Sequence, residues 1–304
     1  MADSIGLIER AAALLRQREA ADLGASAVSP AAPTQTATRL AEPADFTGSE
    51  LVIDRGQLAS YGITIPSSER SRTVEEFRLV KRNLMASWTA GNGSGSRRGG
   101  LIMVTSARPG EGKTFVALNL ALAFASEREA KALLVDVDSQ HSSINSILGL
   151  RDANGIVEVL AGTAELSEAL IHTNIPNLLV IPAGRGGPHV PELFSSSQMA
   201  ALAEELTRRF PDCYIILDTP PCMASSDAAA LAPLVGQIVF VVEANRTQQE
   251  EIEAALSTLS ACSRISLLLN KSELASAHFG SYGYGYHYSG GESDELRSDR
   301  PARS

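Results

Sequence analysis

The sequence has few cysteines and no long apolar run, and both shortages exclude classes of protein. Its three cysteines, Cys213, Cys222 and Cys262, lie far apart without metal-ligand spacing, so neither a disulfide framework nor a cysteine-type zinc site is expected. The low cysteine number fits a reducing cytoplasm, the location that we expect. No run of 18 apolar residues occurs in the 304 residues, so no membrane-spanning helix is predicted.

Basic residues are in short supply. Lysine and arginine total 26 against 35 aspartates and glutamates, which gives a formal net charge of −9. General nucleic-acid binding needs a cationic surface, so this balance argues against a nucleic-acid partner while leaving room for a local basic patch. The N-terminus, MADSIGLIER, carries acids where a signal peptide needs positive charge, so no export signal is expected.

The chain is predicted to begin with two peripheral segments before an ordered one. Residues 1–19 place apolar side chains at helical spacing and are predicted to form a docking helix. Residues 20–50 are rich in Ala, Pro, Thr and Ser, which predicts a flexible linker. Residues 51–98 regain apolar pattern and are expected to form a helical segment that packs on the core.

A capping box indicates where the main helix of this segment starts. Thr73 is followed by Glu76 three residues later, so we expect the helix to begin near Val74. Three charged residues recur at every third position along it: Glu75, Arg78 and Lys81. Their spacing alone favours a solvated charged face of little energetic value, with a subunit-contact strip as the functional alternative.

From residue 99 onward, apolar runs alternate with helical patterns. The apolar runs, interpreted as buried strands, are 101–105, 132–135, 178–182, 214–217, 238–242 and 265–269. The helical patterns are 113–127, 142–148, 155–171, 191–209, 225–234 and 247–261. This alternation predicts an α/β domain over residues 99–272, a mostly parallel sheet with helices on both faces. Residues 273–304 lack apolar pattern and are predicted to be a flexible tail.

A phosphate-binding loop follows the first of these strands. Residues 106–114 read SARPGEGKT, which matches G-x-x-x-x-G-K-[ST] except that Ala107 replaces the first glycine. We expect Lys113 to reach the β- and γ-phosphates of a nucleotide and the Thr114 hydroxyl to bind Mg²⁺. The alternative is a glycine-rich turn that only caps a helix. The residues expected to contact the nucleotide are Pro109, Gly110, Glu111, Gly112, Lys113, Thr114 and Phe115.

Carboxylates end two later strands. Asp136 and Asp138 follow the strand 132–135, and Asp218 follows the strand 214–217. Ligands of open α/β sheets bind outside the carboxyl ends of the strands, so all three acids should meet the phosphate loop. One aspartate there could merely cap a helix, but three favour a metal site. We expect Asp218 to anchor the metal, and Asp136 or Asp138 to contact it or accept a hydroxyl proton.

Together these motifs resemble the bacterial tyrosine kinases of exopolysaccharide and capsule assembly. The similar segments are SARPGEGKT (106–114), LVDVD (134–138), IILDTPP (215–221) and VEANRT (242–247). The segments TVEEFRLVKRNL (73–84) and SIGLIERAAALL (4–15) resemble the autokinases found beside exosortase-associated polysaccharide systems. The related Min and Par partition ATPases share the P-loop fold but carry an additional lysine near the start of the loop, which this sequence lacks.

The resemblance implies an ATP-dependent autokinase that modifies its own C-terminal tyrosines in trans and regulates polymer export. Lys113, Asp136 and Asp138 would then be catalytic, and Thr114, Asp136 and Asp218 would hold Mg²⁺. The implied phosphoacceptors, each separated from the next by one residue, are Tyr282, Tyr284, Tyr286 and Tyr288. Without the ATP site, this cluster would be interpreted as a low-complexity Gly/Tyr tail.

The resemblance also implies partners. These are a membrane-embedded polysaccharide co-polymerase of the chain-length-determinant type, further copies of the chain in a ring, and a cognate tyrosine phosphatase. The chain would then lie at the inner face of the cell membrane through its partner. The family's motif for subunit contacts within the ring reads E-x-x-R-x-x-R, which corresponds here to Glu75, Arg78 and Lys81. Lysine at the last position lacks the planar guanidinium group that pairs with a carboxylate through two hydrogen bonds. Residues 139–141 (SQH) also depart from the arginine that usually follows the position of Asp138.

Asn270 and two other function classes complete the expectations. Asn270 ends the last strand, where P-loop proteins often contact the base, so it is a candidate adenine ligand. A partition-type regulatory ATPase, acting by ATP-dependent dimerisation, is one alternative to the kinase. A scaffold that binds nucleotide without catalysis is the other.

Overall fold

The computed structural model describes seven stretches of the chain, and all of them belong to one compact unit that ends at Ser272. They are residues 50–66, 71–91, 100–127, 130–139, 143–150, 153–185 and 190–272. The predicted docking helix, the linker up to residue 49 and the tyrosine-rich tail lie outside the described residues. In the described stretches, no helix combines the length and the apolar character needed to cross a bilayer.

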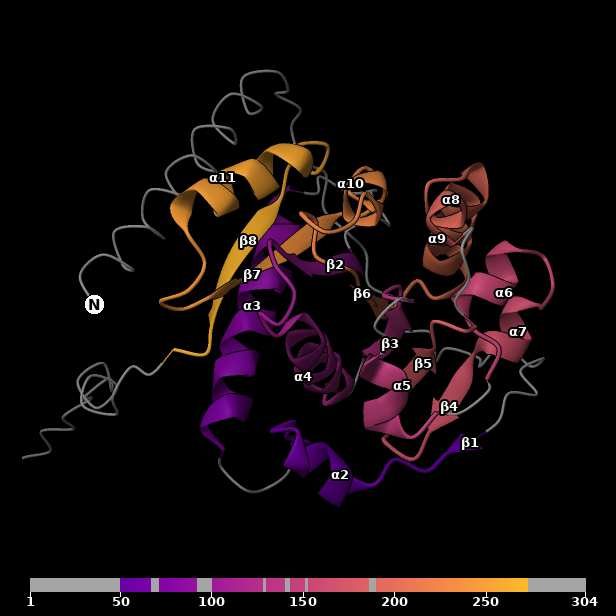
Figure 1. Ribbon diagram of the computed structural model, residues 1–304. Coiled ribbons are helices and arrows are strands. Elements are labelled where there is room, and N and C mark those ends of the chain that lie inside the picture. Colours follow the sequence, from indigo (N-terminus) through magenta and orange to yellow (C-terminus); the bar gives the residue numbers. More distant parts are fainter. Residues whose placement is uncertain are drawn as a thin grey trace, which may run out of the picture. The chain divides into compact units, whose positions relative to one another are not determined.

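An eight-stranded sheet runs through the described part of the chain (Figure 1). Its strands are β1 (Glu50–Leu51), β2 (Leu101–Ser106), β3 (Lys131–Asp136), β4 (Ile171–Thr173), β5 (Leu178–Ile181), β6 (Cys213–Asp218), β7 (Gln237–Glu243) and β8 (Ile265–Asn270). The order is β1-β4-β5-β3-β6-β2-β7-β8, and within this sheet only β4 and β5 pair antiparallel. The predicted mostly parallel α/β sheet is therefore confirmed, and so are its six predicted strands.

Helices cover both faces of the sheet (Figure 1). On one face lie α2 (Arg55–Ser60), α3 (Arg72–Gly91), α4 (Lys113–Ala125) and α5 (Ser143–Leu148). On the other lie α6 (Ile156–Leu160), α7 (Leu166–Ala169), α8 (Val190–Phe194), α9 (Ser197–Arg209), α10 (Asp227–Leu231) and α11 (Gln249–Thr258). Each face has its own apolar core, because alternate residues of a strand point to opposite sides. Leu101 and Met103 of β2 join one core, and Ile102 and Val104 join the other.

The strand and helix that flank the predicted phosphate loop are both deeply buried. Every residue of β2 is buried, and this strand lies inside the sheet between β6 and β7. Eleven of the thirteen residues of α4 are buried, since it packs on the sheet and under α3. A helix that is apolar all round belongs in a core. The loop between β2 and α4 is therefore held at both ends by rigid structure.

Two helix predictions are wrong in detail. The continuous helix expected at 155–171 is instead α6, α7 and the strand β4, because Gly162 adopts a left-handed φ of 70° and ends the helical run. Likewise 191–209 is divided into α8 and α9, since Ser196 caps the second helix by accepting the amide of Met199 at 3.4 Å. Both segments contain the predicted helical spacing of apolar residues, but short turns divide each into shorter elements.

The start of α3 also differs from its prediction. The helix begins at Arg72, and the Glu75 amide donates to the Ser71 carbonyl at 3.2 Å. Ser71 therefore occupies the cap position, and Thr73 lies within the first turn. At the end of the predicted linker, Glu50 already belongs to the sheet as the first residue of β1.

Candidate functional site

The phosphate loop depends on two glycines that sit in backbone conformations unfavourable for other residues. Gly110 has a φ of 84° and Gly112 a φ of 97°. A β-carbon at Gly112 would also lie 2.1 Å from Nδ2 of Asn270, so any other residue there would push this amide away from the Glu111 carbonyl. Lys113 then begins α4 and is buried, with only 7% of its surface exposed. The sequence-predicted loop is therefore built as a tight turn leading into a helix N-terminus.

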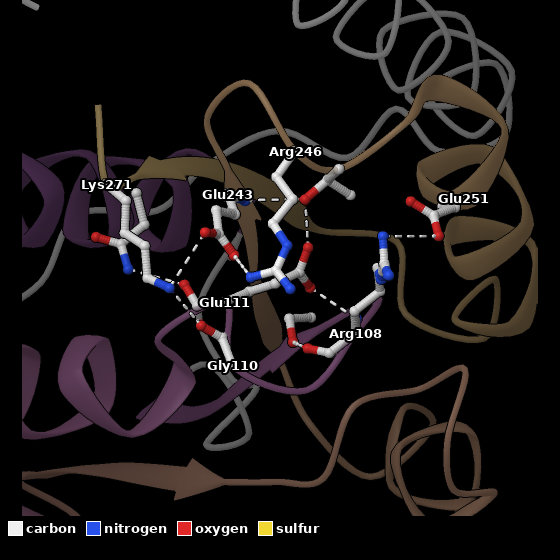
Figure 2. A network of polar contacts seen from close by, with 10 residues as sticks. Arg108, Gly110, Glu111, Glu243, Arg246, Glu251 and Lys271 are labelled. Atoms are coloured by element: carbon white, nitrogen blue, oxygen red, sulfur yellow. Dashed lines mark hydrogen bonds and ion pairs between the residues drawn. The ribbon is translucent and has the colours of Figure 1, made fainter. Parts of the chain in front are cut away.

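The carbonyl groups of the loop face the end of β8. The Gly110 carbonyl accepts Nζ of Lys271 at 2.6 Å, and the Glu111 carbonyl accepts Nδ2 of Asn270 at 2.8 Å (Figure 2). In a trans peptide the carbonyl and the following amide point in opposite directions. The amides of Glu111 and Gly112 therefore face away from β8, which gives the loop the inward-facing N–H groups of an anion-binding nest.

The three predicted acids come together at the carboxyl edge of the sheet. Asp136 and Asp218 are direct neighbours across β3 and β6, and both are essentially fully buried. Asp138 is 6% exposed, and its amide donates to Oδ1 of Asp136 at 3.0 Å. Asp218 lies next to β2 and hydrogen-bonds to the Thr114 hydroxyl. The three strand-end carboxylates thus lie close together, and Asp218 contacts the phosphate loop through Thr114.

Asp218 is the most electrostatically perturbed of these acids. Burial raises its pKa to about 7, although the Thr114 hydrogen bond and the positive charge of Lys113 oppose the rise, and the nearby charge of Asp138 adds to it. One of its oxygens, Oδ1, is buried without a hydrogen-bond partner in the described part of the chain. An orphaned carboxylate oxygen beside a hydroxyl is a suitable place for a magnesium ion or one of its waters.

The donor set suits magnesium better than a fully protein-bound metal. Among the described residues, no group of three or more His, Cys, Asp or Glu side chains is arranged to hold a metal. Mg²⁺ usually keeps several waters and takes only one or two carboxylates together with substrate phosphates. The Thr114 hydroxyl and the neighbouring carboxylates of Asp136 and Asp218 fit that pattern.

Replacing Asp218 with Asn is expected to stabilise the nucleotide-free protein at alkaline pH. The folded-state pKa of about 7 lies above the ordinary value of 3.8, so the unfolded chain ionises first as pH rises and is increasingly favoured. The destabilisation from Asp218 is absent near pH 3.8 and approaches an upper limit of about 4 kcal/mol above pH 7. Thermal unfolding with EDTA should show an advantage of Asp218→Asn that grows from pH 5 to pH 8. A difference in Tm that does not change with pH would contradict this origin.

The charged strip on α3 is divided by the structure. Glu75 and Arg78 pair at 2.5 Å on the surface, each with about half of its side chain exposed. Lys81 instead is buried, and its Nζ donates to the Ala123 carbonyl and pairs with Glu127. Lys81 therefore fastens α3 to α4, and the two exposed residues are left as candidates for contact with another subunit.

Sequence reasoning missed three residues around the site. Thr247 and Lys271 hold the phosphate loop from the ends of β7 and β8. Asp227 at the start of α10 is 4% exposed, and its pKa is raised by burial and by the charge of Asp138, against a hydrogen bond from Ser225. Thr247 lay within the segment 242–247 that carried the family resemblance, and Lys271 directly follows Asn270 at the end of the last strand, whereas nothing local marked Asp227.

Comparison with known proteins agrees with this geometry. A family model described as an AAA domain matches residues 99–270. The tyrosine-protein kinase CpsD of Streptococcus pneumoniae serotype 4 is 35% identical over 183 residues, which cover 59% of this chain and 79% of the relative. The tyrosine-protein kinase YwqD of Bacillus subtilis is 29% identical over 233 residues, covering 76% and 94%.

A solved structure points the same way. The kinase domain of the Escherichia coli tyrosine kinase ETK superposes with a TM-score of 0.58 at 26% identity, covering 76% of this chain and 98% of that domain. Its similarity therefore extends over nearly the whole of an isolated kinase domain. The chain belongs to the bacterial tyrosine kinases, and it is a protein-tyrosine kinase built on a P-loop AAA domain.

Proposed function

We propose that the chain is an ATP- and Mg²⁺-dependent autokinase that phosphorylates its own C-terminal tyrosines in trans and thereby regulates exopolysaccharide polymerisation and export. The observation that carries the proposal is the side-by-side register of Asp136 and Asp218 at the strand ends, next to the loop that bears Lys113 and Thr114. This arrangement joins a phosphate-binding turn to carboxylates within one polar site. Such a site suits phosphoryl transfer, which depends mainly on positioning and charge stabilisation.

The loop residues would bind and orient the triphosphate. Amides of the turn and the helix N-terminus would hold the phosphates, and the buried Lys113 would place its charge on the β- and γ-phosphates. Thr114, Asp136 and Asp218 would hold Mg²⁺, and the bound ion would supply positive charge for the transferring group. Asn270 would contact adenine with the part of its amide that does not hold the Glu111 carbonyl.

Asp136 or Asp138 would accept the proton of the incoming phenol. The Asp138 amide already fixes Oδ1 of Asp136, so the Asp136 carboxylate is held in one orientation. We favour Asp136, which would contact the metal as well, because it lies directly across from Asp218 at the ends of β3 and β6.

Acceptor and partners follow from the family. Tyr282, Tyr284, Tyr286 and Tyr288 would be presented by a neighbouring subunit, with glycine and polar residues between them. Each phosphate adds about −1.5 to −2 charge, so several on one tail would repel an already acidic chain and loosen the ring. A tyrosine phosphatase would reset the cycle. A membrane-embedded co-polymerase would hold the chain at the inner face of the membrane, with residues 1–19 as the docking segment.

Intact mass measured before and after incubation with ATP and Mg²⁺ tests the proposal. The expected result is a ladder of phosphate additions that reaches four per chain and collapses after treatment with a tyrosine phosphatase. EDTA should prevent the ladder, since the proposed site needs Mg²⁺. ATP hydrolysis without any mass gain would instead favour the partition-type regulatory ATPase. Nucleotide binding with neither hydrolysis nor mass gain would favour the scaffold.

A further inference from the structure

The side chain of Glu111 is a buried carboxylate in the middle of the phosphate loop, and it faces Arg108 and Thr247. It is 1% exposed, and both of its oxygens are occupied within the chain. Oε2 accepts the amide of Arg108 at 2.7 Å, and Oε1 accepts the hydroxyl of Thr247 (Figure 2). A buried carboxylate a few bonds from bound phosphates is electrostatically costly, so its presence needs a compensating role.

Thr247 has no freedom to turn away from this contact. Its Oγ1 accepts the amide of Glu243 at 3.0 Å while donating to Glu111, so the hydroxyl is used in both directions. Its own amide donates to the Glu243 carbonyl at 3.2 Å in the turn that leaves β7. The threonine is 8% exposed and is fixed by the turn that follows β7, which pairs with β2 and β8.

The same strand ends hold the loop from a second direction. Glu243 pairs with Lys271 at 3.2 Å, and Lys271 donates to the Gly110 carbonyl. Nδ2 of Asn270 donates a hydrogen bond to the Glu111 carbonyl. The loop is thus held on its outer side by β7 and β8, through contacts that orient its amides inward.

We propose that Glu111 and Thr247 are a positioning pair that shapes the phosphate loop for nucleotide binding. The pair acts through the backbone: Glu111 ties the start of the loop, at Arg108, to the turn after β7. This inference rests on the proposed ATP site, and it assigns to the side chain of Glu111 a role different from direct nucleotide contact. It predicts that loss of the Thr247 hydroxyl weakens binding of the phosphates rather than the chemical step.

Thr247→Val tests the pair, with fluorescent mant-ATP and Mg²⁺ as the probe of binding. The variant keeps the volume of the side chain and removes the hydroxyl, so the Kd should rise about tenfold. Thr247→Ser restores the hydroxyl and should bring the Kd back to within about twofold of wild type. The matched control is Thr207→Val, because Thr207 is equally buried at 8% exposed and bonds only to carbonyls within α9. It should lower the Tm without changing the Kd.

Kinetic measurements and a second substitution distinguish a specific effect on the phosphate loop from a general loss of structural stability. Thr247→Val should raise the KM for ATP while kcat at saturation stays within about threefold, because uniform binding is lost. Glu111→Gln leaves one acceptor oxygen, which the Arg108 amide can keep, and places an NH₂ group where the Thr247 hydroxyl donates, so it breaks the contact with Thr247 and should also weaken binding. The Kd of the double variant should then be no higher than the higher of the two single-variant Kd values, since both changes break the same contact between residues 111 and 247.

The outcomes are separable. A Kd for Thr247→Val equal to that of Thr207→Val, or fully additive effects in the double variant, would overturn the positioning pair while leaving the ATP site intact. If wild type itself failed to bind mant-ATP with Mg²⁺, the proposed function would fail first. Glu158→Gln provides the matching acidic control, because Glu158 is another buried carboxylate that accepts two backbone amides, at Gly155 and Arg185. Its Kd should equal that of wild type.

Discussion

Lys113→Ala is expected to reduce autophosphorylation by about a thousandfold or more, to the detection limit of intact mass measurement. The lysine is buried at the first position of α4, and its charge acts on Asp218. Without it, the charge that develops on the transferring phosphoryl group loses its nearest fixed cation at the end of the loop. Alanine leaves the backbone amides in place, so some nucleotide affinity should persist while transfer is lost.

Lys131→Ala is the matched control for this loss. Lys131 begins β3, and Asp136 ends the same strand, so the two lie at opposite edges of the sheet. This variant should be phosphorylated at the wild-type rate. Circular dichroism should show the same fold for both variants, because the helix that follows the loop is held by its apolar contacts. Phosphotyrosine gained at a normal rate by folded Lys113→Ala would eliminate the proposed chemistry.

The sequence predicts the parts of this fold that depend on local pattern. The six buried strands and the loop are apolar runs and motifs of contiguous residues, so their positions could be derived from period and spacing. β1 and β4 have two and three residues, too short to show a period, and pairing with neighbouring strands creates them. The helical run at 155–171 fails for a similar reason, since Gly162 and the pairing of β4 override its propensity.

The candidate site divides in the same way. Lys113, Thr114 and the three aspartates could be predicted because a motif or a strand end marks each of them. The contacts that hold the loop could not be predicted, because their partners are far apart in the sequence. Glu111 is 136 residues from Thr247 and 159 residues from Asn270. Lys81 shows the converse error. Its spacing matched an exposed strip, but the tertiary packing of α3 on α4 turned it inward to Glu127.

Replacing all four tail tyrosines with phenylalanine is expected to remove essentially all labelling while the ATP site stays functional. Two tyrosines then remain, Tyr61 and Tyr214. Tyr214 is stacked on Phe124 with ring centroids 4.0 Å apart, and burial raises the pKa of its phenol, so it is a poor acceptor. Tyr61 is half exposed but ends α2 in a tight turn, with its amide bonded to Leu58. Labelling at the wild-type level, located to Tyr61 by peptide mass spectrometry, would contradict a tail-borne acceptor.

Mixing this tyrosine-free tail variant with Lys113→Ala decides between transfer within a chain and transfer between chains. The first protein has an intact site and no tail acceptor, whereas the second has acceptors and no site. Their masses differ, so a single spectrum reports the two separately. Transfer in trans predicts that only the Lys113→Ala chain gains phosphate, at a rate that rises with the concentration of the active partner, since the encounter is bimolecular. Transfer in cis predicts that neither chain gains any. The added charge of each phosphate should then slow later additions, because the subunits must meet against increasing repulsion.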